Sequence, residues 1–266
     1  MKIGIIGSGN MGSAIIKGIV NNNLTDSTNI YVYDKDSTKS TKLKEELGIN
    51  VSPIIKDLIN NIDILILAVK PNVSGDIFKE IKNYVTDEVI ISIMAGITIN
   101  TIENSLGSDK KIVRVMPNTP ALVNEAMSGF SINKNITDKD LEVVQSILNS
   151  FGKAELIDES LMDVVTGISG SSPAYVFIMI EALADAAVKE GLPRDKAYKF
   201  ISQAILGSAK MVRDLNIHPG ELKDMVTSPA GTTIEGVKAL EENNFRYALM
   251  EAVEKTTKRS RELGKK

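Results

Sequence analysis

Ile3-Gly4-Ile5-Ile6-Gly7-Ser8-Gly9-Asn10-Met11-Gly12 opens the chain and decides its fold. The first four residues predict a short apolar strand, and residues 13–20 have the pattern of a helix. The turn between them reads G-x-G-x-x-G, which in this setting forms the phosphate-binding turn of a dinucleotide site. Gly7 permits the tight turn, Gly9 lets the pyrophosphate approach the backbone, and Gly12 lets the helix pack closely on the strand. We therefore expect the turn to bind a dinucleotide through Ile6, Gly7, Ser8, Gly9, Asn10, Met11 and Gly12.

Further apolar segments alternate with helical patterns along the first half of the chain. The expected strands are 30–33, 63–69, 89–93, 111–115 and 153–157. Strands alternating with helices are typical of a doubly wound, mostly parallel sheet, and its ligands lie outside the carboxyl ends of the strands. The sequence thus predicts an α/β fold with an N-terminal Rossmann-type domain.

Asp34 follows the second expected strand, 22 positions after Gly12. An acidic residue there usually accepts hydrogen bonds from the adenosine ribose, which favours NADH and repels the 2′-phosphate of NADPH. Lys35 and Lys39 stand nearby, either as partners for that phosphate or as solvated charges at a helix start. The cofactor is therefore expected to be NADPH or NADH, with Asp34 and Lys35 among its contacts.

Three other expected strands end at the same edge of the sheet and supply further cofactor contacts. Lys70 is interpreted as a cofactor contact without a chemical role, or simply as a loop charge. Asn118, in a turn flanked by two prolines, contacts the nicotinamide ribose or amide, or else makes an Asx turn. The full set expected at this edge is Ala68, Val69, Lys70, Pro71, Ala95, Gly96 and Asn118.

The second half of the chain shows no strand pattern and reads as helices with short breaks. We place the boundary after Asp158, giving a Rossmann domain at 1–158 and an all-α domain at 159–266. Residues 167–173 are expected to form a flexible, hinge-like turn. The helix expected at 174–188 is apolar on nearly every face, so we expect it to be buried against a second copy in a homodimer.

Ser228-Pro229-Ala230-Gly231-Thr232-Thr233 leads directly into another expected helix. The free N–H groups at such a helix start attract a carboxylate, so Gly231, Thr232 and Thr233 are candidate substrate contacts. The two threonines have a simpler reading as helix caps. His218, the single histidine, is favoured as a turn residue over a general acid or base.

Composition excludes several classes of protein. The net charge of −3 gives no general attraction to nucleic acid. The absence of cysteine excludes disulfides and thiolate chemistry and fits a reducing compartment, and no metal site is expected. The apolar runs are far shorter than the roughly 20 residues that cross a bilayer, so we expect a cytoplasmic protein without a membrane segment.

Several motifs together resemble the pyrroline-5-carboxylate reductase family along essentially the whole chain. The motifs are Gly7–Gly12, Ala68–Pro71, Val115–Ala121, Gly170–Phe177 and Ser228–Ile234. Ala230 departs from the glycine that the family often has, and Ser172 stands where many members have glycine. The first motif is widespread among unrelated enzymes, whereas the last two together are close to diagnostic of the family.

The resemblance implies reduction of the C=N bond of 1-pyrroline-5-carboxylate to L-proline, the last step of proline biosynthesis. It also implies that Glu159, Ser171, Thr232 and Thr233 lie at the substrate, with Thr233 nearest the imine nitrogen as the catalytic hydroxyl. The helical domain would interlock with that of a twin subunit, and dimers assemble into rings in many members.

Two other readings stay open at this point. A related two-domain imine or 3-hydroxyacid oxidoreductase shares the plan, but hydroxyacid chemistry needs a lysine on the long helix, which offers none before Lys189. A module that senses NAD(P)H without reacting would explain the glycine turn but not the Ser228–Thr233 loop.

Overall fold

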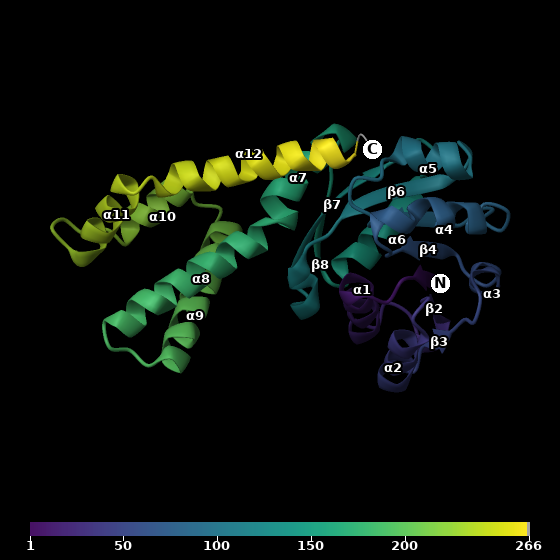
Figure 1. Cartoon of the computed structure of the whole chain (residues 1–266), viewed down its shortest axis with the longest axis horizontal. Coiled ribbons are helices and arrows are strands. Elements are labelled where there is room, and N and C mark those ends of the chain that lie inside the picture. Colours follow the sequence, from purple (N-terminus) through teal and green to yellow (C-terminus); the bar gives the residue numbers. More distant parts are fainter. Residues whose placement is uncertain (265–266) are drawn as a thin grey trace. The chain divides into compact units, whose positions relative to one another are not determined.

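The structure is a computed structural model that describes residues 1–264 and contains two compact units. The described part of the first unit is residues 1–171 together with residues 256–264, and the second unit is Ser172–Lys255. Figure 1 shows the strands within the first unit and the helices of the second.

The described part of the first unit is built on an eight-stranded sheet with the order β3-β2-β1-β4-β5-β6-β7-β8. The strands are β1 (Ile3–Ile6), β2 (Ile30–Tyr33), β3 (Asn50–Val51), β4 (Ile64–Leu67), β5 (Val89–Ser92), β6 (Lys111–Met116), β7 (Ala126–Ile132) and β8 (Gly152–Leu156). Neighbouring strands in this sheet run parallel except β6 and β7. The predicted doubly wound sheet is confirmed.

Strand order reverses beside β1, which pairs with β2 on one side and β4 on the other. The chain fills one side of the sheet from β1 to β3 and then returns to add β4 on the other side. Such a switch point leaves a crevice at the carboxyl ends of the two central strands, where open sheets bind ligands. The turn from Gly7 to Gly12 begins at this point.

Helices cover both faces of the sheet, as two separate apolar cores require. One face carries α1 (Asn10–Asn21), α2 (Ser37–Leu47) and α6 (Asp138–Asn149), and the other carries α3 (Ile55–Ile59), α4 (Ser74–Ile81) and α5 (Ile99–Leu106). Successive strand residues alternate between the cores: Ile5 and Ile66 face α1, whereas Ile6 and Leu67 face α3 and α4. Burial on both faces explains why these strands read as continuous apolar runs.

Two strands were not predicted from the sequence. β3 has only two residues, too few for a pattern. β7 contains serines and a glycine, so neither alternation nor a continuous apolar run marks it. A Cβ on Gly129 would lie 2.9 Å from Val165 Cγ1. Gly129 thus weakens the strand pattern in the sequence but allows α7 (Met162–Val165) to pack closely on β7.

The expected flexible turn at residues 167–173 is wrong. Residues 166–170 form a π-helical turn that follows α7, and α8 (Ser172–Lys189) starts directly afterwards. The Ser171 N–H donates to the Thr166 carbonyl over 2.9 Å, so the backbone is hydrogen-bonded through the segment. Gly170 lies beside the Met116 side chain, where a Cβ would make only ordinary van der Waals contacts.

The second unit is entirely helical, as predicted. It contains α8, α9 (Arg194–Leu215), α10 (Pro219–Met225), α11 (Thr232–Glu242) and most of α12 (Phe245–Leu263), and α8 packs beside α9. Within the described chain, Ala184 is the only buried residue of α8, and Phe177 and Ile178 are 62% and 66% exposed. By length and composition alone, the helical stretch Glu159–Lys189 is long and apolar enough to cross a membrane. The uninterrupted apolar runs in the sequence therefore underestimated the length of this apolar segment.

Ala230 adopts a left-handed backbone conformation, with φ of 54°, in the loop before α11. This conformation costs an L-residue roughly 1–2 kcal/mol, and glycine avoids that cost but loses more entropy on folding. We expect Ala230→Gly to raise the free energy of unfolding by about 0.5–1 kcal/mol, measured by urea denaturation at fixed protein concentration. Ala204→Gly, within α9, is the control and should lower it by about 1 kcal/mol. A loss of stability in Ala230→Gly would contradict the assigned strain.

Candidate functional site

The glycine turn after β1 is packed tightly on one side and open on the other. Gly7 has φ of +104°, and a Cβ there would lie 2.5 Å from the Ala68 carbonyl oxygen. A Cβ on Gly12 would lie 2.2 Å from the Gly7 carbonyl oxygen. At Gly9, in contrast, no described atom lies within 4 Å of the Cβ position. Gly7 and Gly12 thus let backbone pack on backbone, and Gly9 leaves room for a ligand, which fits a bound pyrophosphate.

Three hollows adjoin this turn, all within the first unit, and Gly9 lines each of them. Most of the predicted cofactor residues line at least one: Ile6, Gly7, Ser8, Gly9, Asn10, Met11, Asp34, Lys35, Ala68, Val69, Lys70, Pro71 and Ala95. The sheet therefore gathers residues from four separate strand ends at one edge. Gly12, Gly96 and Asn118 are the predicted contacts that do not line these three hollows.

Asp34 is held against the glycine turn. Its Oδ2 accepts the Ser8 N–H over 2.6 Å and the Ser8 hydroxyl over 2.7 Å, and its Oδ1 accepts the Asp36 N–H over 2.9 Å. Burial alone would raise the pKa of the Asp34 carboxyl, but these hydrogen bonds and the charge of Lys39 lower that pKa below its ordinary value. Asp34 is thus ionised at neutral pH and fixed in position.

Several lysines surround the same edge. Lys39 Nζ lies 3.6 Å from Asp36 Oδ2, and Lys17 Nζ lies 2.6 Å from Glu46 Oε1. Lys42 lines the hollow beside α1 and was not predicted, although its spacing of three from Lys39 places both on one face of α2. Ser13 was also missed; it lines the same hollow and its hydroxyl donates to the Ser8 carbonyl over 2.8 Å.

Asn118 uses its side chain within the protein. Its Nδ2 donates to the backbone and hydroxyl oxygens of Ser169 over 3.2 and 3.3 Å, and its Oδ1 accepts the Met127 N–H over 2.9 Å. These bonds join the turn after β6 to β7 and to the π-helical turn. The predicted contact with the nicotinamide stays a prediction, and the structure adds a connecting role for this amide.

Glu159 is likewise engaged within the first unit. Its Oε1 accepts the Arg114 Nη1–H over 2.9 Å and the N–H of Ile99, the first residue of α5, over 2.8 Å. Arg114 is only 6% exposed, so this pair compensates a buried charge. A carboxylate also suits the positive end of α5. The substrate role implied for Glu159 stays a prediction, beside this structural one.

In the second unit, α11 begins with no side-chain cap among the described residues. Gly231 is the N-cap, and its N–H donates to the Ser228 carbonyl over 3.1 Å. A Cβ on Gly231 would lie 2.3 Å from the Ser228 hydroxyl oxygen, so a larger residue there would force the Ser228 side chain to rotate away. Thr232 and Thr233 are exposed and occupy the first two helical positions, so the simpler reading of both as caps is wrong.

Two other predicted residues lie at helix ends. Ser171 is the C-cap residue of the π-helical turn, and the substrate contact implied for its side chain stays a prediction. His218 is the N-cap of α10, where its Nδ1 accepts the Gly220 N–H over 3.0 Å. The interpretation of His218 as a turn residue is confirmed.

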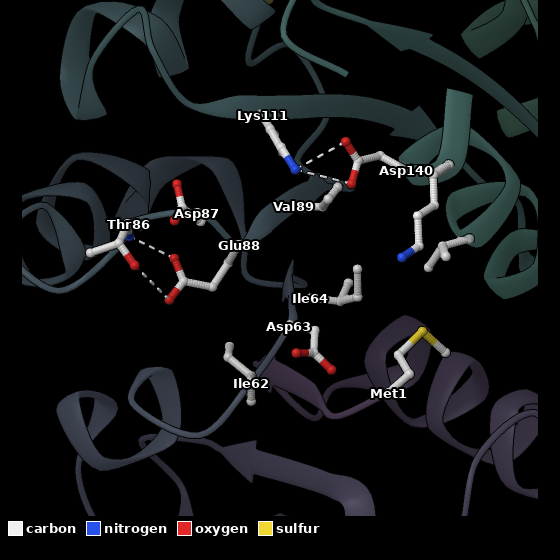
Figure 2. Close-up of a pocket in the computed structure, with 12 residues that line it drawn as sticks. Met1, Ile62, Asp63, Ile64, Thr86, Asp87, Glu88, Val89, Lys111 and Asp140 are labelled. Carbon is white, nitrogen blue, oxygen red and sulfur yellow. Dashed lines mark hydrogen bonds and ion pairs between the residues drawn. The ribbon is translucent and has the colours of Figure 1, made fainter. Parts of the chain in front are cut away.

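A further hollow lies at the opposite edge of the sheet, near the amino ends of β4, β5 and β6 (Figure 2). Lys111 pairs there with Asp140 over 3.0 Å, and Glu88 accepts the Thr86 N–H over 2.6 Å. These charges satisfy groups of the protein itself. Because parallel sheets bind ligands at their carboxyl edge, this hollow is not the functional site.

The sheet, its switch point and the open glycine turn define a Rossmann-type dinucleotide-binding protein with a separate helical unit. Two family models match the two parts of the chain. "Pyrroline-5-carboxylate reductase dimerisation" matches residues 159–263, which include the whole second unit and neighbouring residues of the first, and "NADP oxidoreductase coenzyme F420-dependent" matches residues 2–96, within the first unit.

Curated relatives extend the similarity over the whole chain. Pyrroline-5-carboxylate reductase of Escherichia coli (strain K12) is 46% identical over 265 residues, 99% of this chain and 98% of that one. The enzyme of Methanosarcina acetivorans is 47% identical over 266 residues, 100% of this chain and 98% of its own. The crystal structure of Plasmodium falciparum pyrroline carboxylate reductase with NADP bound is 39% identical, with a TM-score of 0.90 over 99% of this chain and 98% of that one. The chain belongs to the pyrroline-5-carboxylate reductase family.

The glycines of the turn allow a paired test of this site. Gly9→Ala should change the free energy of unfolding by less than about 1 kcal/mol, because its Cβ meets no described atom, yet weaken dinucleotide binding at least about tenfold. Gly12→Ala should instead lower the free energy of unfolding by several kcal/mol, because its Cβ overlaps a backbone oxygen. Urea denaturation and isothermal titration calorimetry measure the two effects. Unchanged dinucleotide affinity in Gly9→Ala would contradict the proposed approach of the pyrophosphate.

The Glu159 side chain allows a test that separates its two roles. Glu159→Gln should lower the free energy of unfolding by about 1–3 kcal/mol, because the buried Arg114 loses its counter-charge. Glu46→Gln, in the exposed pair with Lys17, is the control and should change it by less than about 1 kcal/mol. A raised KM for the substrate with unchanged stability would instead show that Glu159 acts in substrate binding.

Proposed function

We propose that this protein reduces the C=N bond of 1-pyrroline-5-carboxylate to L-proline with NAD(P)H, the last step of proline biosynthesis. The observation that carries the proposal is the combination of two features in one chain. The first unit offers an open glycine turn at the switch point of a parallel sheet, and the second offers an uncapped helix start with two exposed threonines. Family membership along the whole chain supports the same activity.

The first unit holds the dinucleotide. Residues Gly7 to Gly12 receive the pyrophosphate at the start of α1, where backbone N–H groups and the helix dipole favour negative charge. Asp34 and Lys35 lie on the adenosine side of the turn, and Ala68 to Pro71 together with Ala95 lie at the ends of β4 and β5. Gly96 and Asn118 complete the proposed contacts. When bound, the reduced nicotinamide supplies a hydride to the imine carbon.

The second unit holds the carboxylate of the substrate. The N–H groups of Thr232 and Thr233 lie at the positive end of α11, and no side chain of residues 1–264 caps them. Gly231, whose own N–H already donates to the Ser228 carbonyl, is proposed to contact the substrate beside them. A carboxylate is the substrate group that such an end binds best. Ser171, with its hydroxyl, and Glu159 are the further proposed contacts.

Thr233 is the proposed catalytic residue. Its hydroxyl donates to the imine nitrogen, which must gain a proton as the hydride arrives, and a protonated C=N bond is much more electrophilic than a neutral one. The proton itself comes from water. Most of the rate enhancement then comes from orientation, which supplies roughly 7–11 kcal/mol in favourable cases.

A homodimer provides the cover that the second unit lacks. α8 exposes large apolar side chains such as Phe177 and Ile178, and Ala184 is its only buried residue in the described chain. All of α8 lies within the segment that matches the family dimerisation domain. An exposed apolar face of this size is costly in water and marks a binding surface. We propose that a second copy of the chain, rather than a membrane, covers α8, that dimers assemble further into rings, and that the protein is cytoplasmic.

Substitution at Thr233 tests the mechanism. Thr233→Ala should lower kcat at least about tenfold, because a positioned hydrogen-bond donor contributes roughly 10²–10⁴ in general acid catalysis. The measurement is NAD(P)H oxidation that depends on added 1-pyrroline-5-carboxylate. Cofactor oxidation without that substrate would contradict the proposed activity.

Thr233→Ser is the matched control for the hydroxyl, and Thr232→Ala is the control for the helix start. The serine variant should keep most of kcat, since it retains the donor. The Thr232 variant should raise KM more than it lowers kcat. An unchanged kcat in Thr233→Ala removes Thr233 from the chemical step.

A further inference from the structure

The end of β2 carries a charge arrangement that bears on which dinucleotide the protein selects. Asp34, Lys35, Asp36 and Lys39 follow one another within six residues, two acidic and two basic. They lie on the adenosine side of the glycine turn, where NADPH carries a 2′-phosphate and NADH carries a hydroxyl. The inference below rests on the proposed function, since it concerns the cofactor of that same site.

Asp34 accepts more hydrogen bonds than any other side chain of this set, whereas Asp36 accepts one, from the Thr38 N–H at the start of α2. Three protein donors bind Asp34: the Ser8 N–H, the Ser8 hydroxyl and the Asp36 N–H, over 2.6, 2.7 and 2.9 Å. An ionised carboxylate accepts about four hydrogen bonds, so one position on Oδ1 is left over. Asp34 also lines the hollow that contains Gly7 and Gly9. The leftover position suits a ribose hydroxyl.

The charge of Asp34 persists at neutral pH. Burial alone would raise the pKa of this carboxyl, but the bonds from Ser8 and Asp36 and the charge of Lys39 lower the pKa below its ordinary value. A 2′-phosphate carries about −1.5 to −2 charges at pH 7. At this edge it would face a carboxylate that has no means of turning away, because both of its oxygens are bonded to the turn and to Asp36.

The neighbouring lysines do not offset this repulsion. Lys35 and Lys39 are exposed, and Lys39 already lies 3.6 Å from Asp36. Exposed ion pairs are screened by water and salt and contribute little to binding. A fixed, partly buried carboxylate therefore outweighs mobile, solvated ammonium groups.

We infer that Asp34, positioned by Ser8, makes this protein select NADH over NADPH. Asp34 acts as the specificity-determining residue at the adenosine ribose. Ser8 acts through Asp34, as a positioning residue on the glycine turn.

Calorimetric binding of ADP-ribose and of 2′-phospho-ADP-ribose tests this inference, because both ligands lack nicotinamide and no reaction occurs. Wild-type protein should bind ADP-ribose at least about tenfold more tightly. Asp34→Asn should shift the ratio of the two affinities at least about tenfold toward the phosphorylated ligand. Wild-type protein that binds both ligands equally, or the phosphorylated one more tightly, overturns the inference.

Asp36→Asn is the matched control, since it removes the same charge two residues away and keeps a side chain that caps α2. It should change the ratio by less than about threefold. A shift equal to that of Asp34→Asn would show that net charge, not the anchored carboxylate, sets the preference. Lys39→Ala should also change the ratio by less than about threefold, and a larger loss of affinity for the phosphorylated ligand would assign Lys39 as a phosphate contact and overturn the inference.

Ser8→Ala tests the positioning role. It removes one of the two Ser8 donors and should lower the preference for ADP-ribose part of the way toward the Asp34→Asn value. Thermal unfolding of each variant establishes that it is folded. Imine reduction is measured separately, so a failed selectivity test leaves the proposed reaction standing, and a failed reaction leaves the binding preference measurable.

Discussion

Close backbone packing at the switch point of the sheet is the constraint on which the rest of the first unit depends. The Gly7 N–H donates to the Tyr33 carbonyl over 2.8 Å, and the Ala68 N–H donates to the Ile6 carbonyl over 2.9 Å. The ends of β1, β2 and β4 are thereby joined directly. Side chains at Gly7 or Gly12 would push these strand ends apart, because the Cβ positions lie well inside van der Waals contact with backbone oxygens. The cofactor edge exists because these three strand ends can meet.

Hydrogen bonds from polar side chains connect loops and helix ends near the sheet that strand pairing does not join. Asn118 connects the turn after β6 to β7 and the π-helical turn, and Glu159 connects the buried Arg114 to the start of α5. Each satisfies groups that would otherwise be costly when buried. Ser8 and Asp34 do the same beside the glycine turn. The edge is therefore held by hydrogen bonds as well as by apolar packing.

The candidate site was predictable where a single local pattern carries the chemistry. The glycine turn and the strand ends at Asp34, Ala68–Pro71 and Ala95 were identified because the carboxyl edge of a parallel sheet collects the residues that follow each strand. Lys42 and Ser13 were missed, since both lie within helices, where only their packing shows that they face a hollow. The partners of Asn118 and Glu159 lie 45 to 60 residues away or in unpredicted elements, and no local spacing reveals them.

By itself, the sequence determined the doubly wound sheet, the all-α second unit and the apolar surface of α8, because hydrophobic periodicity and glycine spacing are local properties. Only the tertiary structure decided that β7 exists, that residues 166–170 are helical, and that Ala230 takes a left-handed conformation. It also decided that Ser8 holds Asp34. Those features arise from contacts between distant residues, where packing and hydrogen bonding override the preferences of any short segment.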